Sequence, residues 1–129
     1  MGVFDVARQA ALDSVADKVR VGVVADVTAE LTAQDLEWGV QDHPSFDPTV
    51  VVSDGARLAQ AHGVISEEAA RASVEQAAEQ GRLSWAAILV EEVAELFGAA
   101  EDDEALRGEL IQVAAVAAAW AEALARKSE

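Results

Sequence analysis

The chain has 129 residues, enough for one domain with a hydrophobic core, and its nine Lys and Arg against twenty-four Asp and Glu give a formal net charge of −15. Such a charge repels nucleic-acid backbones and anionic membranes, so we expect no nucleic-acid partner. The absence of cysteine excludes disulfides and zinc–thiolate sites, and with no run of eighteen apolar residues and no evident signal sequence we expect a cytoplasmic protein without a membrane partner.

Helical patterns dominate the chain from its beginning. Residues 1–22 are compatible with a helix, but polar and small residues are interleaved along them, so we interpret this segment as an N-terminal helical arm. From residue 23 to residue 38 apolar side chains recur at helical spacing, and Gly39 is expected to end that helix. We therefore divide the chain into an arm, residues 1–22, and a helical domain, residues 23–129.

A loop with two prolines, residues 40–54, comes before the remaining helices. Its residues 50–52 favour an extended conformation, but no second strand is available to pair with them. We expect a short helix at residues 54–61, a helix capped by Ser66 that ends at Gly81, a helix capped by Ser84, and a last helix that reaches the region of Lys127. The sequence thus predicts an all-α chain with about four main helices.

The most informative feature is an acidic pattern on the last two of these helices. Glu92 and Glu95 are three residues apart, as are Glu109 and Gln112, so each pair shares one helical face. At about 100° per residue, Glu92 falls within the apolar stripe of its helix and Glu109 borders the stripe of the next. The short connection at residues 98–103 favours an antiparallel pair of helices, which would bring these oxygens together.

Burying carboxylates costs free energy unless they are paired or bind a cation, so this placement predicts a metal site. Glu91 projects toward the polar side of the same helix, from which it could act through water. A less specific interpretation is that the acidic residues form a solvated face, since Glu is a strong helix former and Glu-x-x-Glu occurs often by chance. Their position on two apolar faces favours the metal site.

Three longer segments carry a family resemblance. They are Trp-Gly-x-Gln-x-His-Pro at residues 38–44, the stretch from Trp85 to Glu95, and the stretch from Glu109 to Trp120. Together they resemble the MazG-like all-α nucleoside triphosphate pyrophosphohydrolases, in particular a small branch of actinobacterial and phage type. The family signature is Glu-x-x-Glu, a variable gap, and Glu-x-x-Asp, and the resemblance covers roughly residues 24 to 126. This chain departs from the signature at Gln112, whose neutral amide oxygen is a weaker ligand for a hard cation than a carboxylate.

The resemblance implies a helical bundle, dimeric or tetrameric, that converts a nucleoside triphosphate, ribo or deoxy, to the monophosphate and pyrophosphate with Mg²⁺ or Mn²⁺. The implied metal ligands are Glu92, Glu95 and Glu109, with Gln112 as a fourth. The implied catalytic residues are Glu92 and Glu91, of which Glu91 would orient the attacking water.

The substrate would be bound by other residues. An indole can stack on a base and amides can read its edge, which makes a candidate set of Trp38, Gln34, Gln41 and His43. The alternative is that Trp38 closes its helix against the core and that His43 shapes the loop. For the outer phosphates the candidates are Arg71 and Arg82, although each could equally be a surface arginine.

Other functions would require other residues or surfaces. A di-iron bundle would need Glu-x-x-His pairs, and neither His43 nor His62 has a Glu three residues before it. Two alternatives stay open: a non-catalytic MazG-like bundle that binds a nucleotide or a partner, and a purely structural helical dimer. We expect Trp85 and Trp120 in the core, and the alanine-rich last helix predicts a homo-oligomer.

Overall fold

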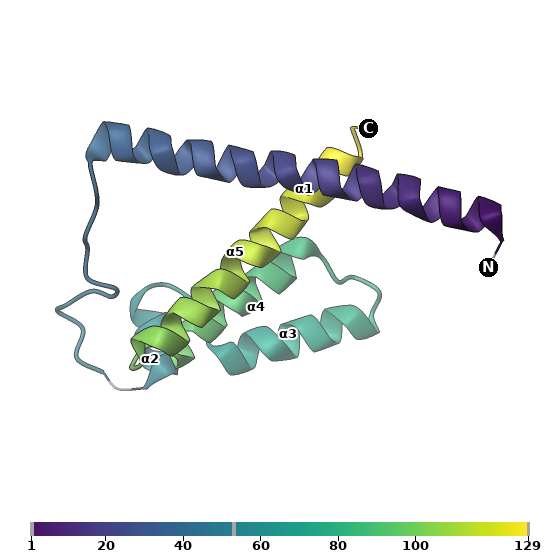
Figure 1. Ribbon diagram of the computed structural model, residues 1–129. Coiled ribbons are helices and arrows are strands. Elements are labelled where there is room, and N and C mark those ends of the chain that lie inside the picture. The colour runs from purple at the N-terminus through teal and green to yellow at the C-terminus, as the bar shows by residue number, and fades with distance from the viewer. Residues whose placement is uncertain (1, 53, 129) are drawn as a thin grey trace. The chain divides into compact units, whose positions relative to one another are not determined.

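The computed structural model describes residues 2–52 and 54–128 (Figure 1). Within these ranges all regular structure is helical, which confirms the all-α prediction. The five helices are α1 (Val3–Trp38), α2 (Gly55–Ala61), α3 (Glu67–Glu79), α4 (Trp85–Gly98) and α5 (Asp103–Arg126).

The chain divides into two compact units. The first consists of residues 1–42 and 118–129, and so contains α1 and the last turns of α5. The second consists of residues 43–117 and contains α2, α3, α4 and the first turns of α5.

α1 is one continuous helix of 36 residues. It therefore runs without a break through residues 22 and 23, between which the expected arm and helical domain are divided. The helix ends where expected, because Gly39 adopts a φ of 71° and its N–H donates to the carbonyl of Asp35. A left-handed conformation at this position is easily reached by glycine alone.

An ion pair joins the two helices of the first unit. The buried carboxylate of Glu122 on α5 accepts hydrogen bonds of 3.3 Å from the Arg20 guanidinium on α1. Val19, the neighbour of Arg20, is buried as well. The guanidinium compensates part of the cost of burying this carboxylate, so loss of Arg20 would leave a buried charge without its partner.

The helices of the second unit begin at the predicted caps. The hydroxyl of Ser66 accepts from the N–H of Ala69, and the hydroxyl of Ser84 accepts from the N–H of Ala87. These bonds satisfy N–H groups that have no partner inside the helix, which fixes the starts of α3 and α4.

The core of the second unit lies where α4 packs against α2 and α3. Leu58 and Ala59 of α2 are buried against Phe97 of α4. The ring of His62, at the end of α2, lies 5.6 Å from the Phe97 ring and 5.7 Å from the Phe46 ring, measured between centroids. His62 Nδ1 is 2.9 Å from the Leu58 carbonyl, and Nε2 accepts from the backbone N–H of Asp47 at 3.0 Å. His62 is thus a helix-end residue, as expected, and its hydrogen bond with Asp47 connects the preceding loop to the end of α2.

Some large apolar residues of α4 and α5 are exposed. On α5, Leu106 is buried, but Leu110 is 48% exposed and Leu124 is exposed as well. Trp85 is exposed at the start of α4, and Trp120 is half-buried. The prediction of a core position is therefore wrong for Trp85, which is 37% exposed.

α5 is long and apolar enough, by length and composition alone, to cross a membrane. Charged and polar residues interrupt its apolar residues, so the sequence has no uninterrupted apolar run of eighteen residues here. Glu109 and Glu122 both lie on α5, and an ionisable side chain within a membrane-spanning helix is unfavourable. The length and composition of α5 are therefore weak evidence for a membrane segment.

Candidate metal centre

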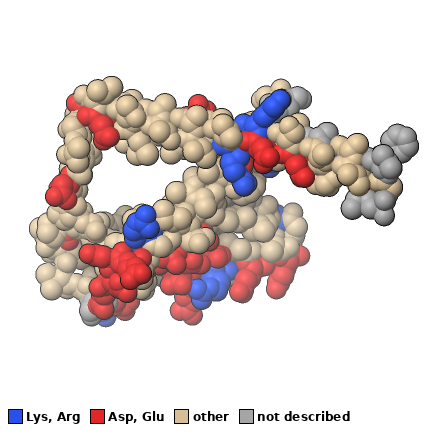
Figure 2. Space-filling view, in the orientation of Figure 1, with Lys and Arg blue, Asp and Glu red and all other residues tan. Residues whose placement is uncertain are grey.

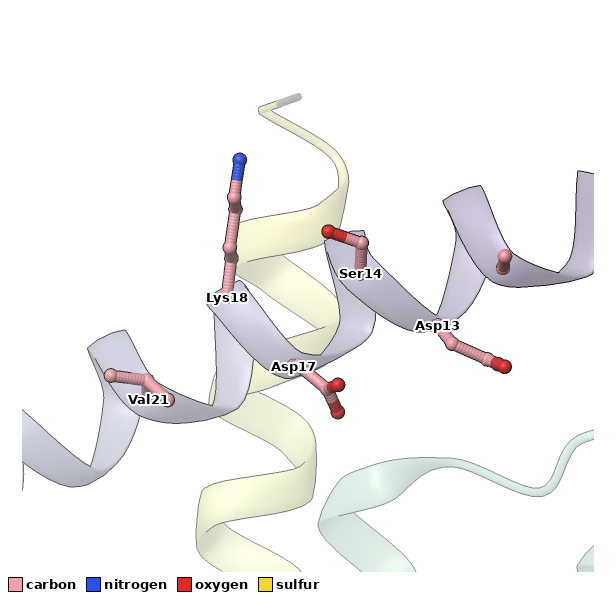
Figure 3. Close-up of a pocket in the computed structure, with 6 residues that line it drawn as sticks. Asp13, Ser14, Asp17, Lys18 and Val21 are labelled. Atoms are coloured by element: carbon pink, nitrogen blue, oxygen red, sulfur yellow. The ribbon is translucent and has the colours of Figure 1, made fainter. Parts of the chain in front are cut away.

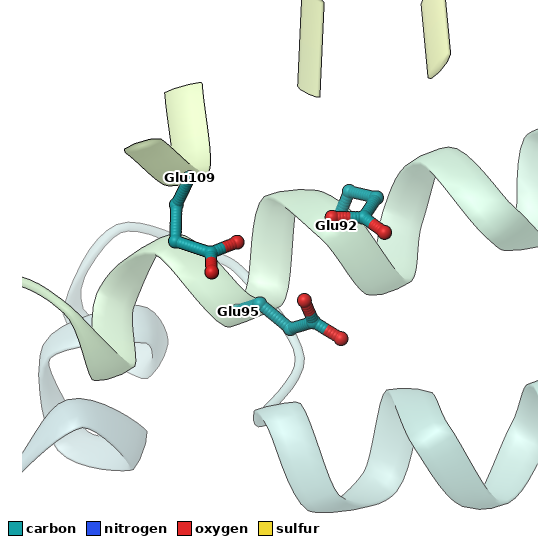
Figure 4. Close-up of side chains that lie close together, drawn as sticks. All are labelled: Glu92, Glu95 and Glu109. Atoms are coloured by element: carbon teal, nitrogen blue, oxygen red, sulfur yellow. The ribbon is translucent and has the colours of Figure 1, made fainter. Parts of the chain in front are cut away.

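Two helices of the second unit bring three carboxylates together. Glu92 and Glu95 lie one turn apart on α4, and α5 turns back after residues 99–102 so that Glu109 reaches α4 (Figure 4). One oxygen from each of the three side chains lies within 4.8 Å of the others. The prediction that these three carboxylates converge is confirmed. We call this group the acidic triad.

The triad is partly withdrawn from water. All three side chains are half-buried, and the Oε2 atoms of Glu92 and Glu109 are buried without a hydrogen-bond partner among the described residues. An unsatisfied buried oxygen costs free energy, and more so when it carries charge. The arrangement is therefore one that a bound cation would stabilise.

Burial and mutual repulsion raise the pKa values of two members of the triad. Burial raises the pKa of Glu95 to about 7, and the charges of Glu92 and Glu109 add to the effect. Burial also raises the pKa of Glu92, followed by the charges of Glu109 and Glu91. Both carboxylates thus hold their negative charge less readily than a solvated Glu.

The chemistry of these residues fits a hard divalent cation. Carboxylate oxygens are the preferred protein ligands of Mg²⁺ and Mn²⁺, and a set of three leaves coordination positions for water or phosphate oxygens. Among the described residues no Lys or Arg forms an ion pair with the triad. The triad could therefore hold a metal ion, whose identity the three oxygens alone do not fix.

The other two predicted residues of this site flank the triad. Glu91 is half-buried on α4, and its charge contributes to the raised pKa values of both Glu92 and Glu95. Gln112 lies on α5 one turn after Glu109 and is exposed. Their predicted roles, water orientation and metal ligation, stay predictions.

Most of the predicted base-binding set lies in the other unit. Gln34, Trp38 and Gln41 belong to the first unit, whereas His43 begins the second. Gln34 donates to the Glu30 carboxylate at 3.2 Å along α1. Trp38, at the end of α1, is 66% exposed.

The structure distinguishes the two candidate phosphate-binding arginines. Arg71 lines a hollow of about 520 Å³ between the start of α3 and the end of α4, where it forms an ion pair of 2.7 Å with Glu67. Arg82 follows α3, does not line that hollow, and donates to the Gln80 side chain at 2.7 Å. Arg71 is thus the better placed of the two.

Glu67 is a residue of this region that sequence reasoning missed. Its carboxylate lies against Gly98, three residues after Glu95 on α4, and its charge is the last of the causes that raise the pKa of Glu95. A Cβ atom added at Gly98 would lie 2.9 Å from Glu67 Oε2, so α3 approaches α4 where α4 has no side chain. The sequence signal is Gly98, three residues after Glu95 and so on nearly the same helical face.

Acidic surface and a second hollow also occur outside the triad. Figure 2 shows acidic side chains gathered along α3 and at the lower end of the second unit, with few basic ones among them. A second hollow, of about 590 Å³, lies along α1 and is lined by Asp13, Asp17, Lys18 and their neighbours (Figure 3). The described residues that line it all come from one stretch of a single helix.

Comparison with known proteins gave no match to this chain among family models, curated proteins or solved structures.

Proposed function

We propose that this protein is a metal-dependent nucleoside triphosphate pyrophosphohydrolase of the MazG-like kind. The observation that carries the proposal is the convergence of Glu92, Glu95 and Glu109, with two buried oxygens that have no partner among the described residues. A carboxylate cluster of this kind is stabilised by a cation, and the resemblance of the surrounding segments supplies the reaction: (d)NTP gives (d)NMP and pyrophosphate.

The charge of the protein is consistent with this reaction. A triphosphate carries several negative charges, and a chain of net charge −15 can bind one at a carboxylate cluster only through a cation. When bound, Mg²⁺ or Mn²⁺ supplies Lewis-acid stabilisation of the charge that builds on the phosphoryl oxygens.

Each nearby residue then has a role in the proposal. Glu92, Glu95 and Glu109 hold the cation, with Gln112 as a fourth ligand through its amide oxygen. Glu91, next to the triad, orients the attacking water and accepts its proton. The base contacts assigned to Trp38 and its neighbours remain part of the proposal and are supported by the exposure of that indole.

A homo-oligomer is also part of the proposal. Large apolar side chains are exposed along both long helices, α1 and α5. A second copy of the chain would cover such surfaces, and closed two-fold assembly is the commonest solution.

One observation favours a second candidate function, a non-catalytic MazG-like bundle that binds a nucleotide or a partner. Gln112 is neutral and exposed at the position where the family signature has a carboxylate. A site with one carboxylate fewer would still hold a nucleotide with its cation, but with weaker stabilisation of the developing charge.

Two measurements test the proposal. The first is a screen for pyrophosphate release from ribo- and deoxyribonucleoside triphosphates with Mg²⁺ or Mn²⁺. The second is calorimetric titration of Mn²⁺ into the wild type and the Glu92→Gln, Glu95→Gln and Glu109→Gln variants. Glu75→Gln, on the exposed surface of α3, is the matched control for loss of one negative charge.

We expect each triad variant to lose most metal affinity and turnover while its circular dichroism stays helical, and the control to keep both. Metal affinity unchanged in Glu92→Gln and Glu95→Gln would contradict the metal site. Normal metal binding without turnover on any triphosphate would instead support the non-catalytic alternative.

A further inference from the structure

The two hydrogen bonds of the His62 ring determine where the ring carries its hydrogen. Nε2 accepts from the backbone N–H of Asp47 at 3.0 Å, so this nitrogen carries no hydrogen. The hydrogen of the neutral ring is therefore on Nδ1, which lies 2.9 Å from the Leu58 carbonyl, a group that can only accept. Both hydrogen bonds are made together only by a neutral imidazole with its hydrogen on Nδ1.

The hydrogen bond with Asp47 holds the loop where an aromatic side chain reaches the core. Phe46 precedes Asp47, and its ring lies 5.7 Å from the His62 ring and 5.5 Å from the Phe97 ring, measured between centroids. Phe46 also packs against the core cluster of Leu58, Ala59 and Phe97. The position of Phe46 on this core therefore depends in part on the hydrogen bond made by its neighbour.

Protonation of the ring would remove this hydrogen bond. A proton on Nε2 turns the acceptor into a donor that faces the Asp47 N–H, and two donors form no hydrogen bond with each other. His62 is exposed, so water can deliver the proton. Histidine is the side chain that ordinarily changes its charge between about pH 5 and about pH 8. Acidification within this range would thus leave the loop without its bond to the ring.

The titratable group beside the ring is the Asp47 carboxylate of the loop, whereas α4 contributes Phe97 and α2 the Leu58 carbonyl. Hydrogen bonds from the Thr49 hydroxyl at 2.7 Å and the Thr49 N–H at 2.9 Å hold the pKa of Asp47 below 3.8. The carboxylate is therefore charged throughout the range in which histidine titrates, and it attracts an imidazolium. Nε2–H of the protonated ring then has the Asp47 carboxylate as a partner, and the Asp47 N–H is left to water.

We propose that His62 is a pH-sensitive contact that holds the loop before α2 when the ring is neutral and releases the loop backbone when the ring is protonated. In the protonated state Phe46 loses its fixed position on Phe97. Because Phe46 and Phe97 also line a hollow of about 300 Å³, acidification changes the shape of that hollow. The inference does not rest on the proposed function, since none of these residues belongs to the triad.

The test is nuclear magnetic resonance of the ¹⁵N-labelled full chain in chelator, from about pH 8 to about pH 5. The side-chain nitrogen shifts of His62 identify the nitrogen that carries the hydrogen. Exchange of the Asp47 amide with water, divided by the intrinsic rate at each pH, gives the protection of that amide. His62→Phe keeps an aromatic ring but has no acceptor, and His43→Gln is the control for the other histidine of the chain.

We expect the hydrogen on Nδ1 at about pH 8, and a protection of the Asp47 amide that falls about fivefold or more toward pH 5, the loss of one hydrogen bond. His43→Gln should show the same fall, and His62→Phe should show weak protection at every pH. A ring with its hydrogen on Nε2 at about pH 8 would overturn the contact. Protection that stays constant while His62 titrates, or that falls equally in His62→Phe, would overturn its pH sensitivity.

A third variant separates His62 from the triad. The Glu95 carboxylate changes its charge in the same pH range, because its pKa is about 7. Glu95→Gln removes this titration and leaves the His62 ring in place, so we expect it to keep the wild-type fall in Asp47 protection. A constant protection in Glu95→Gln would assign the fall to the triad and overturn the role of His62.

Discussion

Glu95 makes the metal-free protein sensitive to pH near neutrality. Its pKa rises from 4.5 to about 7 in the fold, first through burial and then through the neighbouring carboxylates. Because the folded state holds this proton more tightly than the unfolded chain, its contribution to stability is complete below about pH 4.5 and is lost as the pH rises through about 7.

We therefore expect the melting temperature measured in chelator to fall between about pH 5 and about pH 8, and Glu95→Gln to flatten that fall. Glu75→Gln, which removes one negative charge from an exposed position on α3, should retain most of this fall in melting temperature. Thermal denaturation followed by circular dichroism across this pH range makes the comparison. Identical pH profiles for the two variants would show that Glu95 does not titrate in this way.

Gln112 is the residue at which this chain departs from the acidic signature. It is exposed one turn after Glu109, so Gln112→Asp places a carboxylate near the triad without burying it. Each added carboxylate should tighten a hard cation held by oxygen ligands, so we expect a larger Mg²⁺-induced rise in melting temperature than in the wild type. An equal or smaller rise, measured at the same Mg²⁺ concentrations, would mean that position 112 does not reach the cation.

At the scale of the elements, two glycines control how α2 and α3 approach α4. A Cβ atom at Gly55 would lie 2.9 Å from the Phe97 carbonyl oxygen, a backbone atom that cannot turn away. At Gly98 the atom at 2.9 Å is Glu67 Oε2, the end of a flexible side chain. Gly108 on α5 has open space around it.

We expect Gly55→Ala to destabilise the protein by about 1–3 kcal/mol, as overpacking does, and Gly98→Ala to be nearly neutral. Gly108→Ala should stabilise α5 by about 0.5–1 kcal/mol, because alanine loses less backbone entropy in a helix. Urea denaturation of the three variants provides the free energies of unfolding. Equal free energies of unfolding for Gly55→Ala and Gly98→Ala would contradict the expected order of stabilities.

The sequence predicts the features of the second unit that depend on local chemistry. Ser66 and Ser84 cap their helices as expected, since a cap needs little more than the few residues around it. Helical periodicity also suffices to predict that Glu92, Glu95 and Glu109 meet, once two helices are joined by a short connection.

Features that depend on contacts between distant segments are not predictable in this way. Periodicity identifies the apolar stripe of α5 but not whether another helix covers it, and Leu110 is exposed. The interleaved polar residues before residue 23 indicate a weak amphipathic face, yet helix continues through them, because backbone hydrogen bonds do not require a buried face. The position of the Glu67 carboxylate against Gly98 depends on the packing of α3 on α4, which the sequence of either segment alone does not predict.

At the scale of the whole molecule, α1 carries an apolar stripe that the described residues leave uncovered. Val24, Val27 and Leu31 follow one another at helical spacing, and Leu31 is 59% exposed. Contiguous exposed apolar surface of this kind is typical of interaction sites. The net charge of −15 on each copy opposes self-association, so salt that screens this repulsion should favour it.

The double variant Val27→Lys with Leu31→Lys tests whether this stripe holds two copies together. Both residues are exposed within one chain, so the lysines should not unfold α1, but they would place charges in a contact between copies. We expect light scattering to show a dimer for the wild type, stronger at about 500 mM than at about 50 mM NaCl, and a monomer for the variant. Ala29→Lys, on the opposite face of α1, is the control and should remain dimeric. A wild type that stays monomeric in high salt would exclude assembly through α1. A double variant that remains dimeric would indicate instead that the contact between copies lies on the exposed face of α5, where Leu110 and Leu124 lie.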